Sequence, residues 1–180
     1  MHFRACALAH YKKEAFVMDF VIFLDVDGVL NSRTSCVSTP SKKYKGVEPK
    51  RVELLAKAME LTGAGGVVLT STWKDMREDD EDYIYLVESL LKDGIQVVGK
   101  TKEDGWFQRR GTGVIRYLKE HPEVKEYVIL DDQHFDFHND RHLWENFLDT
   151  RGIGIENSVC ASETPSVAAM LFLDAIQRCS

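Results

Sequence analysis

One short stretch decides how this chain folds: Val21-Ile22-Phe23-Leu24-Asp25-Val26-Asp27-Gly28. Four apolar residues lead directly into two aspartates and a glycine. The apolar run does not alternate with polar residues, which is typical of a central parallel strand buried on both faces of a sheet. Ligands of open α/β sheets bind at the carboxyl ends of such strands, where Asp25 and Asp27 are expected to lie. The stretch therefore predicts a buried strand that ends in a ligand site.

Two simpler interpretations of the Asp-x-Asp-Gly segment are a surface turn and a calcium-binding loop. A calcium loop of the common type needs a glutamate at the end of a loop of about 12 residues. Counted from Asp25, that position is Cys36. A plain turn does not need an apolar strand that runs directly into its acids. Two neighbouring carboxylates also repel each other unless a cation or a shared proton lies between them, so we favour a functional site.

Composition describes an ordinary globular chain. The 180 residues are enough for one domain with a single core, and 44% are hydrophobic and 29% charged. No apolar run approaches the roughly 20 residues that span a bilayer, so we expect no membrane partner. The net charge of −6 argues against strong nonspecific binding to nucleic acid. The four cysteines are scattered, which favours reduced thiols and a cytoplasmic location.

The pattern along the chain predicts alternating strands and helices. Residues 1–17 lack a core pattern and are expected to be an N-terminal extension to a domain over 18–180. We expect strands near residues 20–25, 67–73, 95–98, 127–132 and 147–150, with the third near an edge of the sheet. Helices are expected near 49–61, 83–91, 112–118 and 164–176. This alternation predicts an α/β fold, a three-layer Rossmann-like domain with a central parallel sheet. The segment 31–48 is too short for a large cap domain.

A second strand repeats the pattern of the first. Tyr127-Val128-Ile129-Leu130 runs into Asp131 and Asp132. If the two strands are neighbours, their carboxylates converge on a site of hard oxygen ligands that suits Mg²⁺. Between them, the strand near Val67 stops at Thr70 and Ser71, whose hydroxyl groups are suited to bind phosphate oxygens. We interpret the nearby Trp73 as a packing residue. His134, His138 and His142 are spaced as zinc ligands could be, but we interpret them as rim residues of a polar loop.

In this order, these segments resemble the four motifs of the haloacid dehalogenase (HAD) superfamily of phosphatases. The layout over about 18–150 is most similar to the small HAD domains of "Swiss army knife" RNA-repair proteins. The resemblance is carried by the Asp25-Val26-Asp27-Gly28 and Asp131-Asp132 segments, by the hydroxyl residues between them, and by an arginine ahead of a helix. Thr70 fits the family's hydroxyl position best, and Ser71 is a close second. Arg110 is our choice for its basic residue, with Arg109 and Lys102 as alternatives.

The resemblance implies a mechanism for these residues. Asp25 is expected to attack phosphorus and form an aspartyl-phosphate, and Asp27 to act as general acid and base. Thr70, with Ser71 as alternative, and Arg110 are expected to hold the phosphoryl oxygens. Mg²⁺ is expected on the Asp25 side chain, on the Asp27 backbone carbonyl, and on Asp131 or Asp132. The second acid, Asp27, favours phosphoryl transfer over carbon–halogen cleavage.

The expected partner is a phosphorylated substrate: a small molecule, a nucleotide or a nucleic-acid end. Without a large cap the site is expected to be open. Two groups of basic residues are expected to flank it and to favour a polyanion: Lys42, Lys43, Lys45, and Lys100, Lys102, Arg109, Arg110. Two other functions stay open on the sequence, a catalytically silent HAD-like module that binds phosphate or protein, and a phosphotransferase.

Overall fold

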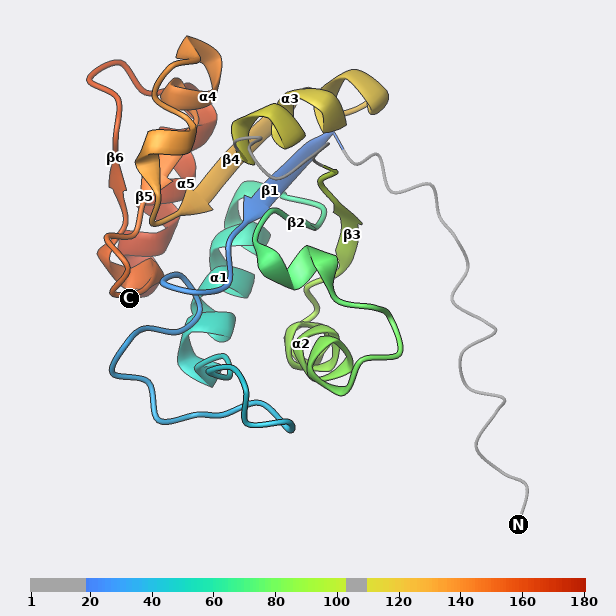
Figure 1. Ribbon diagram of the computed structural model, residues 1–180. Coiled ribbons are helices and arrows are strands. Elements are labelled where there is room, and N and C mark those ends of the chain that lie inside the picture. Colours follow the sequence, from blue (N-terminus) through green and yellow to red (C-terminus); the bar gives the residue numbers. More distant parts are fainter. Residues whose placement is uncertain (1–18, 103–109) are drawn as a thin grey trace.

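The computed structural model describes residues 19–102 and 110–180 (Figure 1). The predicted N-terminal extension, 1–17, and the alternative basic residue Arg109 lie outside the described residues. No helix in the described ranges has the length and apolar character needed to cross a membrane.

A six-stranded sheet forms the centre of the fold, in the order β3-β2-β1-β4-β5-β6. Its strands are β1 (Phe20–Leu24), β2 (Val67–Leu69), β3 (Val97–Lys100), β4 (Glu126–Asp131), β5 (Phe147–Asp149) and β6 (Val159–Cys160). β1 to β5 are parallel, and β6 pairs antiparallel with β5 at one edge. β1 is fully buried in the middle of the sheet, as its unbroken apolar run predicts.

Helices cover both faces of this sheet (Figure 1). They are α1 (Pro49–Thr62), α2 (Glu81–Lys92), α3 (Arg110–Glu120), α4 (Arg141–Glu145) and α5 (Val167–Cys179), with short 3₁₀ helices η1 (Thr72–Asp75), η2 (His134–Asp136) and η3 (Ile155–Asn157). Ile22 and Leu24 of β1 face a core shared with α1, α2 and α5. Val21 and Phe23 face a second core shared with α3 and α4. Three layers result because alternate side chains of a strand point to opposite faces.

The predicted α/β architecture is confirmed, and β3 lies at a sheet edge as expected. Several details differ, mostly at the ends of elements. The described part of α3 already includes Arg110, two residues before the predicted cap at Thr112. The sheet is not entirely parallel because of β6, and α4 was not predicted. Two residues of β6 and five of α4 are too few to show a hydrophobic period.

The segment between β1 and α1 crosses the carboxyl end of the sheet as a loop. Among the described residues, one isolated β-bridge lies outside the named strands. It joins Ser38 to Lys45 within this loop. The buried Asp82 of α2 fastens the loop, because its Oδ1 accepts a hydrogen bond from the Ser41 backbone N–H (3.0 Å) and its Oδ2 accepts one from the Ser41 hydroxyl. The described residues contain no inserted domain at this point, so the end of β1 stays accessible.

Candidate active site

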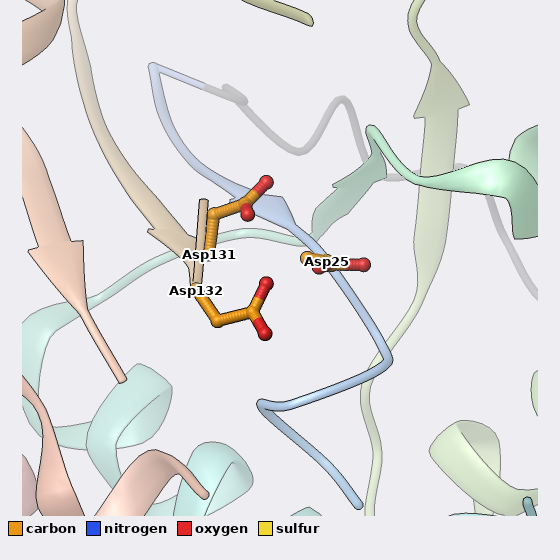
Figure 2. A group of neighbouring side chains, drawn as sticks. All are labelled: Asp25, Asp131 and Asp132. Carbon is orange, nitrogen blue, oxygen red and sulfur yellow. The ribbon is translucent and has the colours of Figure 1, made fainter. Parts of the chain in front are cut away.

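Three carboxylates meet at the carboxyl ends of the two central strands. Asp25 directly follows β1, Asp131 is the last residue of β4, and Asp132 comes next. β1 and β4 are parallel neighbours with Leu24 opposite Leu130, so both acidic segments leave the sheet at one level. Each residue offers a carboxylate oxygen that lies within 4.8 Å of the other two. Figure 2 shows the three side chains gathered around one space beyond the strand ends.

Arg110, the first described residue of α3, contacts two of these acids. Its Nη1 donates to Asp25 Oδ2 (3.1 Å) and to Asp131 Oδ2 (2.7 Å). The guanidinium is largely buried, and charge-assisted bonds of this kind are about twice as strong as neutral ones. The structure therefore brings the predicted basic residue to the predicted acids. The alternative Lys102 is exposed and makes no ion pair with these acids.

Even with Arg110 present, the site has too little positive charge. Burial raises the pKa of Asp25 to about 6, while Arg110 opposes this and Asp132 adds to it. Burial and the neighbouring charge of Asp25 together raise the pKa of Asp131 to about 8, although Arg110 opposes this. Burial also raises the pKa of Asp132. Protons are held tightly here because the ionised carboxylates are short of cations, so a divalent cation fits this donor set.

The two acids after β4 have different surroundings. Both oxygens of Asp131 are engaged, one by Arg110 and the other by the Gln133 backbone N–H (2.8 Å). Asp132 Oδ1 is buried and has no hydrogen-bond partner in the described parts of the chain. Gly28 makes room for Asp132, since a Cβ at this position would lie 2.6 Å from Asp132 Oδ2. Asp132 is therefore the acid that is available to a cation.

The side chain of Asp27 is held at both oxygens. Asn31 Nδ2 donates to Oδ1 (2.8 Å), and Trp73 Nε1 donates to Oδ2 (3.0 Å). Trp73 is fully buried, so it packs as expected, but it also orients a candidate catalytic acid. The sequence carried a usable signal, because a buried indole N–H usually finds a hydrogen-bond acceptor.

Two hydroxyl groups at the end of β2 lack partners. Thr70 Oγ1 and Ser71 Oγ are both buried. Within the described ranges, neither oxygen donates or accepts a hydrogen bond. Ser71 lines the cavity over Asp25 and is near enough to lower the pKa of that acid, although the pair does not reach hydrogen-bond geometry. Thr70 is fully buried and is not part of the cavity lining. Buried hydroxyls without partners indicate an acceptor that arrives with a ligand.

Comparison with protein families agrees with this site. A family model described as "HAD domain in Swiss Army Knife RNA repair proteins" matches residues 21–157. The chain belongs to this family. No curated protein and no solved structure matches the chain. The matched residues of the HAD domain include β1 from Val21 onward, the end of β2, Arg110, and both Asp131 and Asp132.

The cavity at the candidate active site of this HAD domain has a volume of about 760 Å³. Asp25, Asp27, Ser71, Arg110 and Asp132 all line it, together with Asn31. The structure thus brings together most of the residues that the sequence singled out. Asp131 lies behind the lining, fully buried against Arg110.

The basic residues around this cavity are partly those expected. Lys45 and Arg110 line it, as do Arg33 and Arg151, which the sequence did not single out. Lys42, Lys43 and Lys102 are exposed and are not in the lining. Lys100 lies elsewhere, where its Nζ donates to the Met76 carbonyl (3.1 Å) and sits over the ring of Tyr83. His134, His138 and His142 are exposed, outside the lining and outside the acidic cluster.

Proposed function

We propose that this HAD domain is a phosphatase that removes phosphate from phosphomonoesters through an aspartyl-phosphate intermediate and depends on Mg²⁺. The observation that carries the proposal is the convergence of Asp25, Asp132 and Arg110 on one cavity, with the unpartnered hydroxyl of Ser71 beside them. A carboxylate nucleophile, a cation site and donors for phosphoryl oxygens are what this reaction needs. We also retain the cytoplasm as the proposed location.

Asp25 and Asp27 have different roles in the proposed reaction. A carboxylate oxygen of Asp25 forms a bond to phosphorus as the bond from phosphorus to the leaving oxygen breaks. Asp27 gives its proton to that leaving oxygen, then takes a proton from the water that attacks the aspartyl-phosphate. Asn31 and Trp73 hold the Asp27 carboxylate in one orientation for both steps. Free Asp25 and inorganic phosphate result, so the enzyme returns to its starting state.

We assign the cation and the phosphoryl group to different residues. We assign Asp25, Asp132 and the Asp27 backbone carbonyl to Mg²⁺, whereas Asp131 holds Arg110. The ion would supply positive charge that offsets the repulsion between an anionic nucleophile and an anionic phosphate. Arg110 and Ser71 would bind phosphoryl oxygens, because both line the cavity and Thr70 does not.

Hydrolysis of p-nitrophenyl phosphate, with Mg²⁺ and with a chelator, tests the function directly. We expect turnover that requires Mg²⁺ and returns when the ion is added back. The alternative functions predict other results. A silent binding module would bind phosphate without turnover, and a phosphotransferase would yield a phosphorylated alcohol when an alcohol acceptor is present.

Binding of Mg²⁺ should also raise the melting temperature. At a Mg²⁺ concentration about 100 times the dissociation constant, we expect a gain of about 5–10 °C, because a ligand that binds only the folded state stabilises it. Asp132→Asn should remove most of the gain, since it removes the acid whose buried oxygen lacks a partner. Thermal unfolding with and without Mg²⁺ measures both effects.

The exposed Asp79→Asn has the same change in charge and serves as control. It should keep the full gain. An equal gain in Asp132→Asn and Asp79→Asn would contradict the assignment of the ion to this site.

Replacing Trp73 by phenylalanine should lower kcat by about tenfold while KM changes little, because one of the two bonds that orient Asp27 is lost. The ring still fills most of the buried space, so the fold should be kept. Steady-state kinetics on p-nitrophenyl phosphate gives the two constants. Trp144→Phe is the matched control, since Trp144 stacks on Phe147 away from the cavity. Equal losses in the two variants would show that Trp73 acts only through packing.

A further inference from the structure

Three cationic side chains line the active-site cavity without belonging to the proposed catalytic machinery. Arg33 and Lys45 come from the loop between β1 and α1, and Arg151 comes from the turn after β5. In the described parts of the chain, neither Arg33 nor Arg151 has a carboxylate partner for its guanidinium. Lys45 Nζ donates to the Ser35 carbonyl (2.8 Å), a contact that leaves its charge unbalanced. The chain as a whole carries a net charge of −6, so unpaired cations in one cavity call for an explanation.

Arg151 is held in an unfavourable backbone conformation. Its φ is 57°, in the left-handed region that residues with side chains rarely adopt. Its own N–H donates to Asp149 Oδ1 (2.7 Å), which stabilises the turn. On either side, Thr150 Oγ1 (2.9 Å) and the Gly154 N–H (3.0 Å) both donate to the Gly28 carbonyl. Arg151 is therefore fixed beside the segment that carries Asp25, and strained residues held in this way cluster at ligand sites.

Arg33 and Lys45 are tied to the same segment from the other loop. Arg33 lies in a tight turn closed by the Ser35 N–H, which donates to the Ser32 carbonyl (3.1 Å). Asn31 Nδ2, which holds Asp27, also donates to the Lys45 carbonyl (3.3 Å). The three cations thus line the same cavity as Asp25 and lie on backbone that is fixed by hydrogen bonds.

The cavity is also too large for the reacting phosphate alone. Its volume of about 760 Å³ falls within the range of roughly 300–1,000 Å³ typical of pockets for whole small molecules. Asp25, Ser71 and Arg110 provide for one phosphoryl group, and Arg110 is already paired with Asp25 and Asp131. Unpaired arginines bind phosphate through two parallel N–H bonds, and a lysine adds a point charge.

We propose that Arg33, Lys45 and Arg151 form a second anion subsite, which binds a phosphate other than the one removed. The inference rests on the proposed phosphatase function, which places the reacting phosphate at Asp25. The preferred substrate is then a phosphomonoester that carries another phosphate on the same molecule. Nucleoside bisphosphates and phosphorylated oligonucleotide ends share this chemistry.

Matched nucleotides test the subsite. We expect kcat/KM for adenosine 3′,5′-bisphosphate to exceed that for adenosine 3′-monophosphate and adenosine 5′-monophosphate by about tenfold or more, the size expected for hydrogen bonds to a charged group. In the double variant Arg33→Gln/Arg151→Asn, this ratio should fall towards one. Asparagine is chosen at position 151 because it tolerates the left-handed conformation. Arg178→Ala, on α5 and outside the cavity lining, should keep the ratio of the unmodified protein.

Each result decides a separate point. A ratio near one in the unmodified protein, or a high ratio that survives in the double variant, overturns the subsite and leaves the phosphatase intact. If no phosphomonoester is hydrolysed, the phosphatase itself fails. Calorimetry on Asp25→Asn then still tests the subsite. The subsite requires that the bisphosphate binds more tightly than the monophosphates. This difference in affinity should be lost when Arg33 and Arg151 are replaced. Short oligonucleotides with a 3′- or 5′-phosphate, compared with the bisphosphate, identify the source of the second phosphate.

Discussion

Asp25→Asn is expected to abolish phosphatase turnover and, at the same time, to raise the melting temperature. The loss should be about a thousandfold or more, since an amide cannot form the aspartyl-phosphate and removal of a nucleophile leaves only residual catalysis. The gain in stability follows from burial, which raises the pKa of Asp25 to about 6. At pH 7 the folded protein must keep this carboxylate ionised at a cost, and asparagine removes that cost.

The dependence of this gain in melting temperature on pH gives a second measurement. A carboxyl group whose pKa is higher in the folded than in the unfolded state contributes most to stability at low pH. This contribution is lost as the pH rises through about 6. The melting temperature of metal-free Asp25→Asn should therefore exceed that of the unmodified protein at pH 7, and the difference should vanish near pH 4. The exposed Asp93→Asn should change neither activity nor stability. Retained turnover in Asp25→Asn would refute the covalent mechanism.

Arg110→Ala should produce the largest loss of stability of any substitution at the site. Removing one partner of a buried ion pair typically costs about 3–5 kcal/mol, because the remaining charge stays buried without compensation. Here Asp25 and Asp131 both lose their cation. Turnover should fall by a factor of about 100–1,000, as when a charged donor to a transition state is removed. Urea denaturation at pH 9, above the pKa of about 8 that burial gives Asp131, measures the free energy of unfolding while both acids are ionised.

A double variant separates the charge effect from a packing defect. Arg110→Ala/Asp131→Asn removes the cation and one of its two acids, so it should recover a substantial part of the lost stability without recovering turnover. The single variant should also regain stability as the pH falls, because both acids then bind protons. A double variant that is no more stable than Arg110→Ala would show that Arg110 stabilises through its packed side chain.

The central part of the fold was predictable because local sequence patterns indicate its strands. An apolar run without alternation indicated that β1 is buried on both faces, and the same pattern at β4 placed Asp131 and Asp132 at the same edge. The choice between these two acids was not predictable. It depends on which acid Arg110 reaches from α3, and neither pattern nor spacing fixes how a helix docks on a sheet.

Sequence reasoning missed other parts of the site, again for physical reasons. Arg33 and Arg151 lie in loops, where no period marks a residue as facing a cavity. Trp73 is buried like any packing residue, and only its N–H contact with Asp27 distinguishes it. Ser71 rather than Thr70 lines the cavity, because the direction of a side chain just beyond a strand depends on how the backbone leaves the sheet.

The two hydrogen bonds that the Gly28 carbonyl accepts from Thr150 and Gly154 have a consequence for the order of folding. The bond from Thr150 joins residues 122 positions apart, and contacts of such long range are the slowest to form. As the chain leaves the ribosome, every proposed catalytic side chain emerges before the turn that fastens the Asp25 segment. A nascent chain that stops at Asp132 would carry the whole set of reactive groups without the backbone that aligns them. We therefore expect activity to appear in one late step, when the turn over 150–154 docks.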